Sequence, residues 1–305
     1  MRTTSTPTLE DFRASRETLV GIDSDGCVFD TMTVKQCVHF HPLIVSSWHL
    51  EAIGKEVRET AEFLNLRSCW RGRNRFTNLL LTFEMLARRA DVAGKAPLPR
   101  LDSLRAYCES GVPLGNPSLE EAVRATDDAE LRRTLEWSLA VNEDIAHRMR
   151  PIPPFRWAVE ALRRMQGHSD TLVVSQTPFE ALSREWRQHG IDHLVAAIAG
   201  QEAGSKTTQL LEAAAGRYKP GRMLMIGDAP GDRAAAREAG ALFYPILPGR
   251  EEESWRLFCE RDYPRFLAGE LDAATLDALQ AEFDALLPDT PPWEETRPTT
   301  PDDAG

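Results

Sequence analysis

The sequence predicts an α/β protein with a doubly wound, parallel, five-stranded core and an all-helical domain inserted after the first strand. Three observations lead to this prediction. After residue 150, short apolar segments typical of buried parallel strands alternate regularly with helical patterns. One further apolar segment of this kind lies far upstream, at 19–22. Between them, residues 33–150 carry helical patterns and no convincing strand.

The first predicted strand, 19–22, ends directly at Asp23, and Asp25 and Gly26 follow at once. In an extended chain, aspartates two residues apart point to the same face. Two close carboxylates can share a site only with a cation or a shared proton, so the pair predicts a metal site, an acid–base pair, or both. A plain strand followed by an Asp-Gly turn explains the same residues without any function.

The segments on either side of this strand are predicted to be helical. A short helix is expected at 9–18, before the strand. In the insert, Pro42 is expected to interrupt an early helical pattern. Amphipathic patterns then predict helices over 52–66 and 76–89, with further helices from Ser118 and from Asp127 or Asp128 to about 148. We therefore assign 33–150 to one helical domain.

Residues 151–287 complete the core together with residues 1–32. Strands are predicted at 171–174, 194–199, 223–226 and 241–246, and helices at 155–166, 179–189, 207–215, 232–239 and within 253–287. Helices between short apolar strands predict right-handed crossovers and a parallel, Rossmann-like sheet. Residues 288–305 are rich in proline and acidic residues, which predicts a disordered tail.

Composition excludes several classes of function. The chain has 305 residues and a formal net charge of −11, so it lacks the basic excess that binding to nucleic acid or anionic membranes needs. Its five cysteines include no C-x-x-C pair, which argues against a zinc site or a disulfide framework. It contains no apolar run long enough for a membrane span and no secretory signal. We expect a cytoplasmic protein, either a monomer or a homodimer.

Polar residues suited to phosphate chemistry follow four of the predicted strands. They are Asp23 and Asp25, then Ser175-Gln176-Thr177, then Gly204-Ser205-Lys206, and finally Asp228 and Asp232. Since the carboxyl ends of parallel strands share one edge of a sheet, these groups can converge. Taken singly, Ser175 can simply begin a loop, and Lys206 can be a solvated lysine at a helix start. Lys219 competes with Lys206, but it precedes a strand and so belongs to the opposite edge.

Together the four segments resemble the motifs of the haloacid dehalogenase superfamily, namely D-x-D, a Ser or Thr, a Lys, and G-D-x-x-x-D. The run from Asp23 to Thr31 is most similar to the branch of phosphoglycolate phosphatase and β-phosphoglucomutase, which carries a helical cap after the first strand. The resemblance implies a Mg²⁺-dependent phosphatase that hydrolyses a small phosphomonoester metabolite through an aspartyl-phosphate. The alternatives are a sugar-phosphate mutase that uses the same site and a catalytically silent binding protein with this fold.

The resemblance also implies roles for individual residues. Asp23 would be the nucleophile, and Asp25 would be the general acid and then the general base. This division of labour requires environments that separate the pKa values of the two carboxyl groups. Ser175 would hold a phosphoryl oxygen, helped by substrate-binding backbone N–H groups at Gln176 and Thr177.

The same resemblance implies a charged centre around the nucleophile. Lys206 would neutralise the charge of Asp23 and of the phosphoryl group. Mg²⁺ would be held by the Asp23 side chain, the Asp25 carbonyl oxygen and Asp228, with Asp232 binding behind them or through water. An all-oxygen site that also uses substrate phosphate suits this ion.

An arginine-rich stretch at 67–75 is the predicted place of substrate choice. It contains Arg71, Arg73 and Arg75 around Gly72, in an otherwise acidic chain. A guanidinium group binds carboxylate or phosphate in a fork, so a polar or anionic leaving group is expected. A solvated turn whose arginines pair with nearby acids is the alternative.

Overall fold

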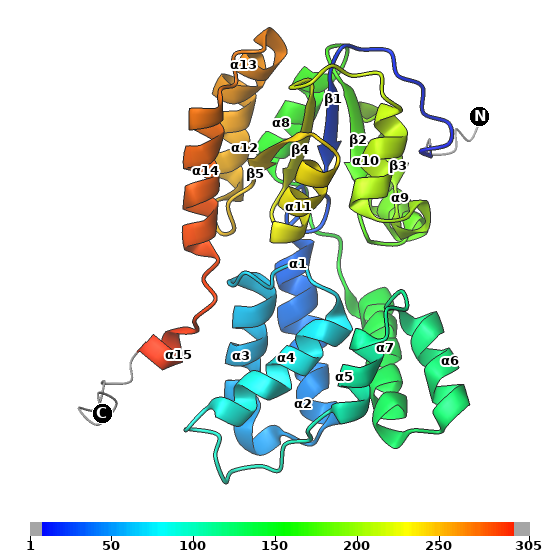
Figure 1. Cartoon of the computed structure of the whole chain (residues 1–305), viewed down its shortest axis with the longest axis vertical. Helices are drawn as coiled ribbons and strands as arrows, with labels where there is room; N and C mark the ends of the chain where they lie inside the picture. Colours follow the sequence, from blue (N-terminus) through cyan, green and yellow to red (C-terminus); the bar gives the residue numbers. More distant parts are fainter. Residues whose placement is uncertain (1–7, 296–305) are drawn as a thin grey trace. The chain divides into compact units, whose positions relative to one another are not determined.

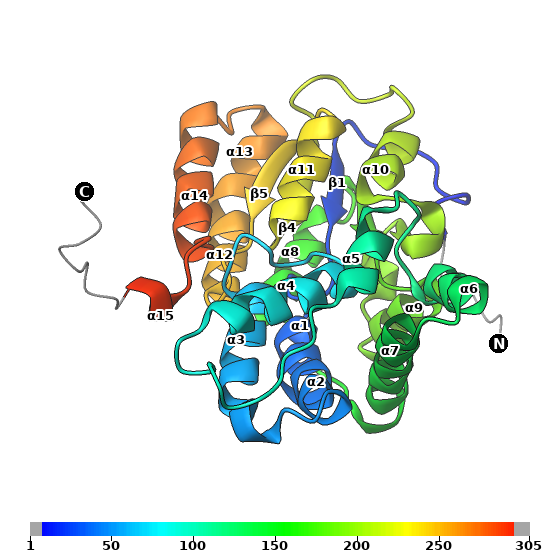
Figure 2. The ribbon, with the colours of Figure 1, turned by 60° about the horizontal axis from the view of Figure 1, so that its bottom comes forward.

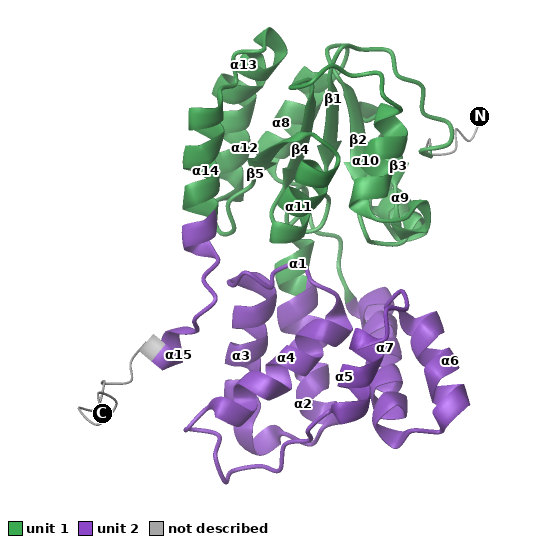
Figure 3. Ribbon diagram, in the orientation of Figure 1, with its two compact units in different colours: residues 1–34, 149–283 green, residues 35–148, 284–305 purple. Residues whose placement is uncertain are grey.

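The computed structural model describes residues 8–295 and divides the chain into two compact units (Figure 3). The first, here called the core unit, comprises the described residues up to 34 together with 149–283. The second, here called the helical unit, comprises residues 35–148 and the described residues from 284 onward. The chain therefore passes between the units three times, after residues 34, 148 and 283.

The core unit is built on one five-stranded parallel sheet, as the sequence predicts. Its strands are β1 (Leu19–Ile22), β2 (Asp170–Val174), β3 (Ala197–Ala199), β4 (Met223–Gly227) and β5 (Leu242–Pro245). Their order is β3-β2-β1-β4-β5, so the winding reverses between β1 and β4. Ile22 is in register with Ile226, which brings the carboxyl ends of these two strands together at the place where such sheets bind ligands.

Helices cover both faces of this sheet (Figures 1 and 2). On one face, the side chains of Val20 and Ile22 in β1 belong to the same hydrophobic core as α8 (Arg156–Met165), α9 (Phe179–Gln188) and α12 (Glu251–Leu257). On the other face lie α10 (Lys206–Ala214) and α11 (Pro230–Glu238), with Leu210 of α10 above Gly21. The remaining elements are α1 (Thr31–Val34), the 3₁₀ turns η3 (Asp192–Leu194) and η4 (Gln201–Ala203), the π-helix η5 (Phe258–Asp262), α13 (Tyr263–Ala268) and α14 (Ala273–Leu286).

The helical unit has a hydrophobic core of its own, in which Trp48 contacts both Phe83 and Trp137. Its described residues form no strand. Its elements are the π-helix η1 (Lys35–Phe40), α2 (His41–Ser47), η2 (Glu51–Ile53), α3 (Gly54–Leu66), α4 (Arg75–Arg88), α5 (Asp102–Glu109), α6 (Asn116–Thr126), α7 (Ala129–Arg148) and α15 (Pro292–Glu295). Between residues 8 and 295, no helix combines the length and the apolar character that crossing a membrane requires.

Two local predictions are wrong for identifiable reasons. The segment 9–18 contains a turn at 9–11 and no helix, and the Asp170 carboxylate accepts hydrogen bonds from the backbone N–H groups of Ser15 and Arg16, so these groups bond outside the segment. Pro42 does not interrupt the helical run from α1 through η1 to α2. It lies near the start of α2, directly after the π-helix η1, whose wider turn lets the helical run continue past a proline.

The described part of the C-terminal extension also differs from the prediction of a disordered tail over 288–305. The Pro288 carbonyl accepts a hydrogen bond from the Cys69 N–H (3.2 Å). The Trp293 ring packs edge-on against Phe63 at 5.6 Å, and the Arg89 guanidinium lies 4.3 Å from the Trp293 ring centre. These contacts attach 288–295 to the helical unit, whereas 296–305 lie outside the described residues.

Candidate active site

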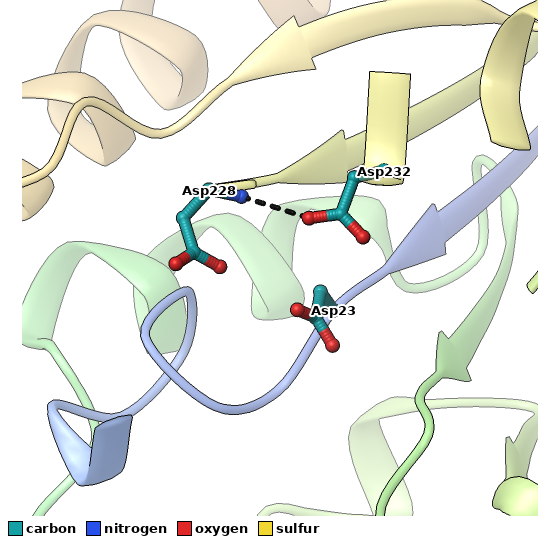
Figure 4. A group of neighbouring side chains, drawn as sticks. All are labelled: Asp23, Asp228 and Asp232. Atoms are coloured by element: carbon teal, nitrogen blue, oxygen red, sulfur yellow. Dashed lines mark hydrogen bonds between the residues drawn. The ribbon is translucent and has the colours of Figure 1, made fainter. Parts of the chain in front are cut away.

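Asp23 lies at the carboxyl end of β1, in the centre of the sheet (Figure 4). Its backbone N–H continues the β1–β4 pairing by donating to the Ile226 carbonyl (3.0 Å). The side chain is only 4% exposed, and its Oδ1 accepts a hydrogen bond from the Ser24 N–H (2.8 Å). The end of a central strand therefore places a buried carboxylate at the edge where substrates of such folds bind.

Asp25 lies in the turn that follows. Gly26 adopts a left-handed backbone conformation (φ 80°), which residues other than glycine rarely adopt. Its N–H donates a hydrogen bond to the Phe29 carbonyl (2.8 Å). The Asp25 carboxylate accepts hydrogen bonds from the hydroxyl groups of Thr31 and Thr177, the latter at 2.8 Å. Two hydroxyl donors, one 6 residues and the other 152 residues away along the chain, thus orient this carboxylate. Neither contact is predicted from the sequence.

Lys206 is the first residue of α10, behind the N-cap Ser205. Its ammonium group lies 2.9 Å from Asp23 Oδ2 and 2.5 Å from Asp232 Oδ1. The buried Gln209 holds the loop before α10, because its amide donates to the carbonyl groups of Ser175, Gly200 and Gly204 at 2.8–3.0 Å. Gln209 is a positioning residue that the sequence analysis missed; its polar side chain on an otherwise apolar helix face was the available signal.

The segment after β4 supplies the other two carboxylates. Asp232 Oδ2 accepts hydrogen bonds from the N–H groups of Asp228 (3.2 Å) and Ala229 (3.0 Å) at the start of α11 (Figure 4). A Cβ atom on Gly227 would lie 2.4 Å from the Asp232 side chain. Glycine is therefore required at position 227 so that Asp232 can fold back over the strand end.

These elements bring three buried carboxylates together. Ligand atoms of Asp23, Asp228 and Asp232 all lie within 4.8 Å of one another. Burial raises the pKa of Asp23 well above its usual range, Asp232 and Asp228 raise it further, and Lys206 offsets only part of the effect. Burial alone would lower the pKa of Lys206, but Asp23 and Asp232 raise it, so the lysine remains an ammonium group. Asp23 and Asp232 thus share the ammonium group of Lys206.

The loop after β2 lies beside this cluster. Ser175 is buried; its N–H pairs with the Ala199 carbonyl and its hydroxyl accepts from the Thr177 N–H, both at 3.1 Å. The Gln176 side chain donates to the Gly204 carbonyl (2.9 Å) and so braces the Lys206 loop. The side chains of Gln176 and Thr177 therefore bond to protein groups, and their predicted contact with substrate stays a prediction.

A family model for haloacid dehalogenase-like hydrolases matches residues 18–240. The chain belongs to this family. The matched range covers every predicted site residue, from Asp23 to Asp232. The curated proteins searched include none that matches significantly.

Solved structures with similar folds share little sequence with this hydrolase. A candidate phosphoglycolate phosphatase from Lactobacillus delbrueckii is 15% identical, with a TM-score of 0.47, and the match covers 76% of this chain and 87% of that one. A predicted phosphoglycolate phosphatase from Haemophilus somnus is 14% identical, with a TM-score of 0.44, covering 77% and 87%. A candidate β-phosphoglucomutase from Bacteroides vulgatus is 15% identical, with a TM-score of 0.44, covering 86% and 93%.

The carboxylate cluster of this haloacid dehalogenase-like hydrolase fits a divalent cation. Its donors are all oxygens, which suits Mg²⁺ rather than a soft metal. Burial, and after it the other two carboxylates, raise the pKa of Asp23 and so disfavour its ionised form, and a nearby dication would favour that form. Asp23 and Asp228 would be its side-chain ligands. Asp232 is already engaged by Lys206 and two backbone N–H groups, so it would support them from behind.

The three predicted substrate-binding arginines have different environments within the helical unit. Arg71 is 3% exposed and donates to the Leu66 carbonyl (2.9 Å), so it stabilises the end of α3. Arg73 is exposed to solvent. Arg75 is the first residue of α4 and is partly buried among neutral groups. Contact of these arginines with substrate stays a prediction.

Proposed function

We propose that this hydrolase is a Mg²⁺-dependent phosphatase that cleaves small phosphomonoesters through an aspartyl-phosphate on Asp23. One observation supports the proposal above the others. The carboxylate at the end of β1 is paired with Lys206 at 2.9 Å, and the carboxylate two residues later is oriented by Thr31 and Thr177. A nucleophile beside a cation, with a separately held acid group nearby, is what two-step phosphoryl transfer requires.

In the first step an Asp23 carboxylate oxygen forms a bond to phosphorus while the bond from phosphorus to the leaving oxygen breaks. The carboxylic acid of Asp25 gives its proton to that leaving oxygen, so the product departs as an alcohol. Thr31 and Thr177 position Asp25 for this transfer. Lys206 stabilises the anionic charge of Asp23 and of the phosphoryl group.

In the second step the Asp25 carboxylate takes a proton from water as the water oxygen bonds to phosphorus. The bond from phosphorus to Asp23 breaks, inorganic phosphate leaves, and the Asp23 carboxylate is restored. Ser175 is proposed to bind a phosphoryl oxygen, assisted by backbone N–H groups of its loop. A bound Mg²⁺ would neutralise charge that develops on the phosphoryl oxygens.

The test is hydrolysis of an aryl phosphate by the purified full chain, followed as release of inorganic phosphate. Activity should require Mg²⁺ and disappear with EDTA. Asp23→Asn should lower kcat by on the order of 10⁴-fold, since the nucleophile is lost. Asp25→Asn should lower it by about 10²–10⁴-fold for a poor leaving group, since proton transfer is lost.

The matched control is Asp30→Asn, which changes an aspartate of the same loop and should leave turnover unchanged. Full activity in Asp23→Asn would refute the mechanism. Conversion of a sugar phosphate into its isomer without phosphate release would instead identify a phosphomutase on the same residues.

A further inference from the structure

Two buried tryptophans hold the turn that carries Asp25. The indole N–H of Trp186, on α9, donates to Ser24 Oγ at 3.0 Å. The indole N–H of Trp255, on α12, donates to the Cys27 carbonyl oxygen at 2.7 Å. Both rings are fully buried, and both helices belong to the core unit. The two hydrogen bonds therefore hold the chain on either side of Asp25.

Burial of a tryptophan does not by itself create such contacts. The indole N–H of Trp137, in the helical unit, is also buried and has no hydrogen-bond partner among the described residues. In the core unit, Trp157 packs at the edge of the hydrophobic core, and its indole donates to none of the residues between 8 and 295. The convergence of Trp186 and Trp255 on one short turn is therefore a specific property of that turn.

Ser24 is the centre of the turn. Its N–H donates to Asp23 Oδ1 (2.8 Å), and its carbonyl oxygen accepts hydrogen bonds from the N–H groups of Val28 (2.9 Å) and Phe29 (3.2 Å). Ser24 is completely buried, so its hydroxyl group needs a hydrogen-bond partner, which the Trp186 indole supplies. The Trp186 ring also packs edge-on against Phe29, with 6.0 Å between the ring centres. Trp186 thus contacts the first and the last residue of the turn 24–29.

Trp255 connects the turn to a part of the chain outside the family match, which ends at residue 240. On the same helix, the Glu252 carboxylate accepts a hydrogen bond from the Arg156 N–H (2.8 Å) at the start of α8. The N–H of the preceding residue, Phe155, donates to the Val28 carbonyl (2.8 Å). Helix α12 therefore supports the turn directly through Trp255 and indirectly through the start of α8.

An indole N–H is a neutral donor that does not titrate, so it fixes the turn without adding charge beside the carboxylate cluster. The position of Asp25 matters because proton transfer requires hydrogen-bonding distance, and a small displacement of a catalytic group strongly lowers the rate. We propose that Trp186 and Trp255 are positioning residues for Asp25, which hold the turn 24–29 so that its carboxyl group reaches the leaving group. The catalytic consequence rests on the proposed phosphatase function, whereas the support of the turn does not.

The first arm of the test measures the turn itself, without turnover. Amide hydrogen exchange of the full chain is followed by mass spectrometry in peptides that contain residues 24–29. Trp186→Phe and Trp255→Phe each remove an indole N–H and keep an aromatic ring, so exchange in these peptides should become about tenfold faster or more. Ser24→Ala removes the same hydrogen bond as Trp186→Phe with a much smaller change in volume, and it should have a similar effect. Trp157→Phe is the matched control and should leave exchange in the turn unchanged.

The second arm compares two substrates by kcat/KM, which reports the steps up to release of the leaving group. An alkyl phosphate needs the proton of Asp25, whereas para-nitrophenyl phosphate has a good leaving group and needs that proton far less. The three variants Trp186→Phe, Trp255→Phe and Ser24→Ala should therefore lower kcat/KM about tenfold or more for the alkyl ester, but less than about threefold for the aryl ester. The double variant of Ser24→Ala and Trp186→Phe should lose no more than either single variant, because both remove one hydrogen bond.

Unchanged exchange in the turn in all three variants would overturn the proposal. So would equal losses of kcat/KM on both esters, which are the result expected of tryptophans that only stabilise the fold. A wild type that hydrolyses neither ester would refute the proposed phosphatase function. The exchange rates would then decide by themselves whether the two indole groups hold the turn.

Discussion

The charged side chains of the two units have different surroundings. In the core unit, three carboxylates lie within 4.8 Å of one another, and two of them, Asp23 and Asp232, pair with the ammonium group of Lys206. In the helical unit, the Arg75 guanidinium has only neutral partners among the described residues. The contrast teaches that the core unit gathers charged groups at the end of one strand, whereas neutral polar groups hold Arg75 in the helical unit.

Removal of the Lys206 ammonium group should have the largest effect on stability and activity. Without Mg²⁺, Lys206→Met leaves Asp23 and Asp232 without a counter-charge, which should lower the free energy of unfolding by about 3 kcal/mol. Turnover with Mg²⁺ should fall by about 10²–10³-fold, because one electrostatic stabiliser is lost. Urea unfolding with and without Mg²⁺ measures the first effect. The exposed Lys219→Met is the control, and equal stability of the two variants would contradict the argument.

A second variant tests whether the carboxylate cluster depends on backbone shape. Gly227→Ala places a methyl group 2.4 Å from the Asp232 side chain, so Asp232 must move away from Lys206. Overpacking of this kind should cost about 1–3 kcal/mol in the free energy of unfolding and most of the activity. Gly231→Ala, with no atom within 4 Å of the new methyl group, should be neutral or slightly stabilising. Similar losses of stability in both variants would show that the segment 227–231 does not tolerate added side chains in general, and that the contact with Asp232 is not the cause.

A third prediction concerns the buried His41 of the helical unit, which becomes a cation when the pH is lowered. Burial, with a smaller effect of Arg58, lowers the pKa of His41 from 6.5 to about 4, and its Nε2 has no hydrogen-bond partner among the described residues. Because the folded state binds this proton more weakly than the unfolded state, stability present above pH 6.5 is lost as the pH falls towards 4. The loss should reach about 2–3 kcal/mol.

Urea unfolding between pH 7 and 4 measures this loss. His41→Leu should remove the pH-dependent component, whereas the exposed His147→Gln should retain it. An unchanged pH profile in His41→Leu would assign the acid sensitivity to other groups.

The smallest expected effect concerns Arg89, which has the acidic partners that Arg75 lacks. Trp293→Ala removes the ring that covers Arg89 and packs on Phe63, but the carboxylates of Glu59 and Asp91 remain. The free energy of unfolding should therefore fall by only about 1 kcal/mol. Limited proteolysis should cut the chain after residue 287 faster. Val112→Ala, at an exposed apolar residue, is the control, and equal cleavage rates in the two variants would contradict the attachment.

The contacts that orient the site lie beyond sequence reasoning. Thr177 and Asp25, which share a hydrogen bond, are 152 residues apart, and Gln209 and Ser175 are 34 apart. No spacing rule relates such positions, because the approach depends on how each loop leaves its strand. The same holds for Asp170, which accepts a hydrogen bond from the backbone N–H of Ser15, 155 residues away.

The sequence by itself determined the strands, their parallel direction and the four polar strand ends, because apolar runs and turn residues act within a few positions along the chain. Parallel winding then brings Asp23, Lys206 and Asp232 to one edge without further information. Only the tertiary structure decided which charges find partners. Arg75 and Arg71 belong to one arginine-rich stretch, yet Arg71 braces a helix end while Arg75 meets neutral groups from α7, 63 and 67 residues away. The partner of each charged side chain depends on how the helices pack against one another, and local sequence patterns do not encode that packing.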